Sequence, residues 1–192
     1  MKKISQIIAY SLLGVVVLAF VLTATIKKDF APNIIVPTYE SKGIEIKQAG
    51  LAKYDGLGDN DNYNKFVKEY NSSFKLTILY SIFSGEISRT QAVTNIGKTA
   101  PSIDSGYVVT FNYPENQVLK SNGKVYYEST NSDTKTLYKK VFFVVENGKG
   151  LVSKNIYFYS EANSSYYKLT TLANFDNLYN FIVELPMFAE QE

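Results

Sequence analysis

Residues 7–26 form an apolar run that contains no charged side chain. As an α-helix, which rises about 1.5 Å per residue, this run spans about 30 Å, the thickness of the hydrocarbon core of a bilayer. A core helix of a soluble domain shows a polar face, which residues 12–22 lack. A cleaved signal peptide usually has a shorter apolar region, of about 7 to 15 residues, and here the run continues past the weak cleavage site at residues 17–19. The pattern therefore predicts an uncleaved transmembrane anchor at residues 7–26, with a cleaved signal peptide as the alternative.

Residues 27–60 lack a sustained period and contain several turn formers. Pro32 and Pro37 bracket a short apolar stretch, and a proline interrupts helices and central strands alike. Ile44 and Ile46 alternate with polar residues, which predicts a short edge strand. We expect residues 27–60 to be an extracytoplasmic tether with some local structure.

Residues 61–192 are expected to form one folded domain that begins with a helix. Over residues 61–71 the aromatic and aliphatic side chains recur at helical spacing. Asp59, Asn60 or Asp61 can cap this helix, because a short polar side chain accepts the unpaired N–H groups of a first helical turn.

Two segments after this helix have ambiguous patterns. Residues 75–83 are rich in β-branched and aromatic side chains, which favours a strand, but the run is too short for its period to decide. Residues 87–96 are expected to be a short helix or irregular.

The pattern from residue 106 onward predicts strands joined by tight turns. Residues 107–113 alternate apolar and polar side chains, as a half-buried strand does. Residues 114–116 are expected to turn the chain, and Asn122-Gly123 between apolar residues is a strong signal for a tight hairpin. Further strands are expected at residues 137–146, 151–160 and 166–172, with turns at 147–150 and 162–165.

The last predicted element is a helix over residues 175–185, with Asn174 as its cap and Pro186 as its end. Helices and strands in this order predict an α+β fold: an N-terminal transmembrane helix, then one domain in which an antiparallel meander of about five strands packs against helices. Cystatin-like and nuclear-transport-factor-like folds share this plan, an analogy of fold that implies no function.

The distribution of charge predicts the orientation of the anchor. The chain has 20 basic and 18 acidic side chains, and Lys2 and Lys3 are the only charged ones before Lys27. The positive-inside bias therefore predicts a short cytoplasmic tail of residues 1–6 in a single-pass protein of the cell membrane, with the C-terminal domain extracytoplasmic. The remaining chain is balanced, which argues against a nucleic-acid partner, since such proteins present a basic surface.

The composition excludes several kinds of catalytic site. The chain has no Cys and no His, so Ser-His-Asp and Cys-His arrangements and the usual zinc sites cannot form. Residues 97–99 resemble the end of a phosphate-binding loop, but Ala92 replaces its first glycine, so we expect no nucleotide. Glu128, Glu146 and Glu161 fall near predicted strand ends, and no pattern selects a pair of carboxylates for hydrolysis. We expect no cofactor and no enzymatic activity.

The acidic cluster of the chain is Asp55, Asp59 and Asp61. Calcium takes oxygen ligands from such loops, but an EF-hand would require Asp or Asn at position 63 and Gly at position 64, where this chain has Tyr63 and Asn64. We expect a solvated loop and a helix cap, and a looser calcium site stays open as the alternative.

Tyrosines are concentrated in the predicted sheet, at positions 126, 127, 157, 159, 166 and 167. We expect most of them in the core; the alternative is a helix-free sheet face on which their rings stack on sugars or pack on a protein.

The sequence features together predict a non-catalytic interaction or sensory module at the cell envelope, with a membrane or envelope protein as its partner. The alternatives are an extracytoplasmic domain that binds cell-wall material or carbohydrate, and a carboxylate-based hydrolase.

Overall fold

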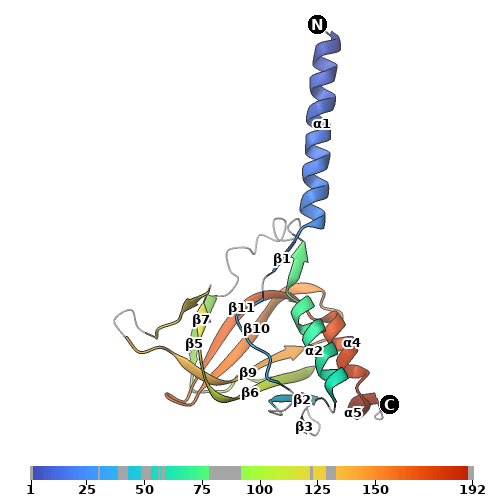
Figure 1. Cartoon of the computed structure of the whole chain (residues 1–192). Helices are drawn as coiled ribbons and strands as arrows, with labels where there is room; N and C mark the ends of the chain where they lie inside the picture. Colours follow the sequence, from blue (N-terminus) through green and yellow to red (C-terminus); the bar gives the residue numbers. More distant parts are fainter. Residues whose placement is uncertain are drawn as a thin grey trace.

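The computed structural model describes residues 2–29, 31–38, 43–48, 53–55, 57, 59–77, 92–121, 123–128 and 133–189. Figure 1 shows a long N-terminal helix that projects from a domain built of a sheet and shorter helices. The helices are α1 (Lys2–Thr25), α2 (Asn60–Ser72), α4 (Asp176–Val183) and α5 (Pro186–Ala189). The strands are β1 (Lys27–Asp29), β2 (Ile44–Gln48), β3 (Lys53–Asp55), β4 (Lys75–Thr77), β5 (Ala92–Gly97), β6 (Tyr107–Val118), β7 (Lys120–Ser121), β8 (Lys124–Val125), β9 (Leu137–Val145), β10 (Leu151–Ser160) and β11 (Ser165–Asn174). This is an α+β fold, as predicted.

Helix α1 is long and apolar enough to cross a membrane or to act as a signal sequence. Its window from Gln6 to Thr25 has a mean hydropathy of 2.6, and no part of it is buried against the domain. It is therefore not a core helix of the described chain. The hydroxyls of Thr23 and Thr25 donate to the carbonyls of Ala19 and Val21 at 3.0 and 2.9 Å, so both are satisfied within the helix.

The domain starts directly after this helix. β1 pairs antiparallel with β4, which follows α2 in the sequence. β4 confirms a strand for the first residues of the ambiguous segment 75–83, and the rest of that segment lies outside the described residues. β2 and β3 also fall within residues 27–60, so the sheet includes chain that we assigned to the tether.

Seven strands form the main sheet, in the order β3-β2-β6-β9-β10-β11-β5, and every neighbouring pair is antiparallel. The strand predicted at Ile44 and Ile46 is confirmed as β2, but its predicted place at an edge was wrong, because β2 pairs on both sides and both isoleucines are buried. The expectation of a helix or irregular chain at residues 87–96 was wrong in its described part. There the β-branched Val93 and Thr94 lie in β5, which pairs with β11.

The meander β6-β9-β10-β11 confirms the predicted strands at residues 107–113, 137–146, 151–160 and 166–172. The predicted turn at residues 114–116 was wrong: these residues continue β6. The β6–β9 pairing shifts register between Asn112 and Gln117, so this stretch bulges, and a bulge accommodates Pro114, which has no N–H to donate. β7 and β8 confirm the hairpin, with Gly123 at φ +75°.

Helices α2 and α4 cover one face of the sheet (Figure 1) and enclose an aromatic core. Asp59 caps α2 by accepting from the N–H of Asn62 at 2.7 Å, as the sequence predicted. The predicted cap at Asn174 was wrong by one residue, because the N-cap of α4 is Phe175, which makes no side-chain cap bond. Asn174 lies just before it and its side chain accepts from the N–H of Asp176 at 2.9 Å, and α4 ends before Pro186, which starts α5. The buried rings that join the helices to β6 and β9 belong to Phe66, Tyr70, Phe74, Phe111, Phe143 and Phe175.

Tyr70 carries a hydroxyl that is buried without a hydrogen-bond partner among the described residues. Burial, with a smaller contribution from Tyr138, raises the pKa of this phenol far above its usual range. Because a buried unpaired hydroxyl keeps its desolvation cost, Tyr70→Phe is expected to raise the free energy of unfolding by about 1 kcal/mol. Chemical denaturation of the full chain in detergent micelles measures this change.

The matched control is Tyr167→Phe, which removes a hydroxyl that donates to Glu128 Oε1 at 3.0 Å. This variant should lose about 1 kcal/mol instead. Burial keeps the Tyr70 phenol protonated in the folded state, whereas the unfolded chain ionises it above about pH 10. The free energy of unfolding is therefore independent of this group below about pH 10 and falls as the pH rises further. Tyr70→Phe should therefore flatten the alkaline part of the stability profile, and a variant less stable than the parent would contradict the assignment.

Candidate functional site: a groove on the helix-free face of the sheet

Successive side chains along each strand point alternately to the helix-covered face of the sheet and to the opposite face. On β6, Val109 and Phe111 are buried under the helices, whereas Val108 and Thr110 point the other way and are only half-buried. This alternation places one set of side chains from each of five neighbouring strands on a face that none of the described helices covers, which we call the helix-free face (Figure 1).

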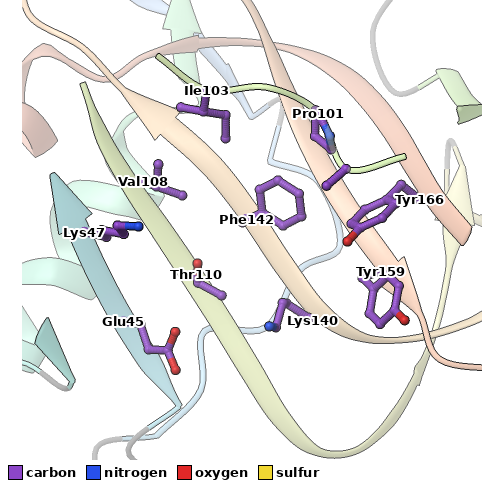
Figure 2. Close-up of a pocket in the computed structure, with 11 residues that line it drawn as sticks. Glu45, Lys47, Pro101, Ile103, Val108, Thr110, Lys140, Phe142, Tyr159 and Tyr166 are labelled. Carbon is purple, nitrogen blue, oxygen red and sulfur yellow. The ribbon is translucent and has the colours of Figure 1, made fainter. Parts of the chain in front are cut away.

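The segment that joins β5 to β6 crosses this face of the sheet and covers part of it. β5 lies beside β11 at one edge, and the next strand, β6, lies beyond β10 and β9, so residues 98–106 must cross several strands. Figure 2 shows Pro101 and Ile103 of this crossover lying over the sheet. Ser105 Oγ donates to Glu146 Oε1 at 2.8 Å and anchors its far end.

Gly106 makes the turn from the crossover into β6. Its φ of +78° favours glycine, and a Cβ there would lie 2.8 Å from the carbonyl oxygen of Val145. The close approach of the two backbones therefore depends on this glycine.

Between the crossover and the sheet lies a groove of about 700 Å³ (Figure 2). This volume is typical of ligand sites in proteins, which are about 300 to 1,000 Å³. Its lining residues are Glu45 and Lys47 of β2, Val108 and Thr110 of β6, Lys140 and Phe142 of β9, Tyr159 of β10, Tyr166 of β11, and Ala100, Pro101 and Ile103 of the crossover.

Aromatic rings packed against one another occupy one end of the groove. The rings of Tyr159 and Tyr166 lie 4.9 Å apart, centroid to centroid, and Phe142 meets Tyr166 edge-on at 6.2 Å. Tyr157, beside the groove, stacks on Phe142 at 5.3 Å with the ring planes 22° apart. Because each ring is held by its neighbour, the surface that they present is already ordered before anything binds.

Charged side chains lie at the other end and along the floor. Glu45 and Lys47 point to the same face of β2, and Lys140 lies directly opposite Tyr159 in the pairing of β9 with β10. Lys140 is exposed and has no ion pair with any described residue. The groove thus combines ring faces, two ammonium groups and one carboxylate.

The structure places only some of the predicted tyrosines in this groove. Tyr159 and Tyr166 line it, whereas Tyr167 is buried on the opposite face and packs against Tyr126 at 5.9 Å. Tyr127 is 41% exposed outside it. Phe142 and Lys140 were missed because residues 137–146 are apolar on both faces and give no sign of which face stays open.

The three carboxylates near strand ends interact with other parts of the domain and do not line the groove. Glu128 accepts from the side-chain amides of Asn95 and Asn163 at 2.7 and 3.1 Å, Glu146 accepts from the crossover, and Glu161 pairs with Lys139 at 3.9 Å. Among the lining residues Glu45 is the one carboxylate, whereas hydrolysis of a glycosidic bond by the usual mechanism needs two.

The acidic cluster does not assemble into a site within the described chain. The carboxylate of Asp59 caps α2, Asp61 lies in the first turn of that helix, and Asp55 is in β3, with its side chain outside the described residues. No group of three acidic side chains that could hold a metal ion occurs in the part of the chain that the structure describes.

Comparisons with protein-family models, with curated proteins and with solved structures found no match to this chain.

Proposed function

We propose that this protein is a membrane-anchored, non-catalytic binding module of the cell envelope, and that it binds through the groove on the helix-free sheet face. In this proposal residues 7–26 cross the membrane once, residues 1–6 are cytoplasmic, and the domain lies outside. A cystatin-like or nuclear-transport-factor-like plan is proposed for the domain as an analogy of fold only.

The observation that carries the proposal is the ordered aromatic surface in a groove of ligand-binding size. Rings on a free sheet face are normally covered or dispersed, because exposed apolar surface is unfavourable in water. Here Tyr159 and Tyr166 are half-buried, held by other rings and open to the groove, which suits them to contact a ligand.

Because the chain has no cysteine, single cysteines can test both the surface and the topology. Ala100→Cys places a thiol on the exposed groove wall, and Asn177→Cys places one on exposed α4, away from the groove. A photoreactive maleimide probe attached in intact cells should give a reproducible adduct from Ala100→Cys and none from Asn177→Cys. Equal adducts from both positions, or none from either, would contradict binding through the groove.

The same variants report the orientation of the anchor. A membrane-impermeant maleimide should label both positions in intact cells, whereas Ser5→Cys, which keeps Lys2 and Lys3, should react only after lysis. Labelling of Ser5→Cys alone in intact cells would reverse the proposed topology. A cleaved signal peptide would remove that position from the mature protein and leave it unlabelled even after lysis.

A further inference from the structure

We propose that the ligand of the groove is an acidic polysaccharide, with sugar rings against Tyr159 and Tyr166 and a carboxylate at Lys140. This inference rests on the proposed function and specifies its ligand class. Three properties of the groove support it: the strands of its floor are hydrogen-bonded on both sides, its side chains follow a particular order, and the groove is long.

The floor offers no unpaired strand to an incoming peptide. β2, β6, β9, β10 and β11 each pair with a neighbour on both sides, so their main-chain groups are used within the sheet. An extended peptide that binds by adding a strand needs a free edge, which this face does not present. Recognition in the groove therefore relies on side chains.

Those side chains match the three kinds of surface that an acidic sugar carries. The apolar face of a pyranose ring can lie on a tyrosine ring, and its hydroxyls can donate to the carboxylate of Glu45. A sugar carboxylate can accept from the ammonium of Lys140, which would be a charge-assisted bond.

The positions of the lysine and the two tyrosines across the sheet match a sugar ring that carries a carboxylate. Lys140 is opposite Tyr159 in the β9–β10 register, and Tyr159 is opposite Tyr166 in the β10–β11 register. Neighbouring strands lie about 4.8 Å apart, so the ammonium-bearing chain and the two rings occupy consecutive positions across about 10 Å. Lys47 adds a second positive charge on β2, partly balanced by Glu45 on the same strand.

The length of the groove favours a polymer over a single small molecule. Its lining reaches from β2 to β11, which are four strand spacings, or about 19 Å, apart. A chain of several sugar units can follow the whole groove, placing rings at the aromatic end and hydroxyls or further carboxylates at the charged end.

Binding of defined oligosaccharides by the full chain in detergent micelles tests the proposal. The probe is an oligogalacturonate, which carries a carboxylate on each ring, and its methyl ester is the control with the same rings and no charge. Calorimetry should show binding of the acid that is about tenfold tighter than binding of the ester, which corresponds to about 1.4 kcal/mol for one charge-assisted contact. Tyr159→Ala should weaken binding of both forms.

Lys140→Gln should remove most of the preference for the acid, whereas Lys168→Gln should keep it. Lys168 lies opposite Tyr157 on the same sheet face but does not line the groove, so it is matched in charge and location. Circular dichroism of each variant checks that the fold is kept.

The other outcomes separate this inference from the proposed function. Equal affinity for the acid and its ester, lost in Tyr159→Ala, would overturn the acidic ligand and keep the groove as a binding site. Equal binding of linear polyphosphate would show a charge effect without ring recognition and overturn the sugar assignment. No binding of any oligosaccharide, together with a groove-specific adduct from Ala100→Cys in cells, would overturn the polysaccharide alone, and failure of both experiments would overturn the proposed function too.

Discussion

Replacing Phe111 with alanine is expected to lower the free energy of unfolding by about 3 to 5 kcal/mol, a large part of the stability of a domain this size. Phe111 is fully buried and its ring meets Phe66, Tyr70 and Phe143 at centroid distances of 6.0, 5.4 and 5.6 Å. The substitution would remove contacts to α2 and β9 together and leave a cavity that these rings, held by others, cannot close. Urea denaturation of the full chain in detergent micelles measures the loss.

Thr110→Ala is the matched control for this prediction, because Thr110 is the adjacent residue on β6 and points to the other face. It should cost less than about 1 kcal/mol, the range of intrinsic strand preferences. Similar losses in the two variants would mean that the helix-covered face is not the core of the domain.

A pair of lysines in the middle of α1, Leu13→Lys with Val17→Lys, is expected to remove the protein from the membrane fraction. Both positions are exposed to the surroundings of the helix, at 59% and 54%. Each lysine at the centre of a spanning helix costs about 2.5 to 3.5 kcal/mol of insertion free energy. Two of them offset much of the apolar contribution of a single helix, so carbonate-resistant association with membranes should be lost.

The control pair, Asn33→Lys with Ile35→Lys, adds the same charge at exposed positions outside the apolar helix. That variant should stay in the membrane fraction at the level of the parent. If the α1 pair also stays there after carbonate extraction, the helix does not hold the protein in the membrane by crossing it.

Local patterns were reliable where one physical constraint dominates. Three hydrophobic patterns each showed which side chains are apolar and must be shielded from water: the apolar run of α1, the helical period of α2 and α4, and the alternation of β6. The positions of these elements could therefore be predicted from the sequence. The cap at Asp59 and the hairpin at Gly123 followed from hydrogen bonding and from backbone geometry. The turn predicted at Pro114 was wrong because a bulge in the β6–β9 pairing accommodates this proline within the strand. The local sequence does not show where the partner strand β9 lies.

The candidate site is a property of pairing between distant segments. That Tyr159 and Tyr166 share a surface with Lys140 depends on the register of β9, β10 and β11, and their separation from Tyr167 depends on which face the helices cover. The wall of the groove exists because β5 pairs with β11 instead of with β6, which sends residues 98–106 across the sheet.

The sequence by itself therefore determined the N-terminal apolar helix, the charge bias at its start, the α+β class and the absence of Cys and His side chains from any site in this chain. Only the tertiary structure decided which aromatic residues are core and which line a groove, because a strand with apolar side chains on both faces satisfies either arrangement until its neighbours are known. Burial on one face and exposure on the other were fixed when α2 and α4 packed on one side of the sheet and the crossover on the other.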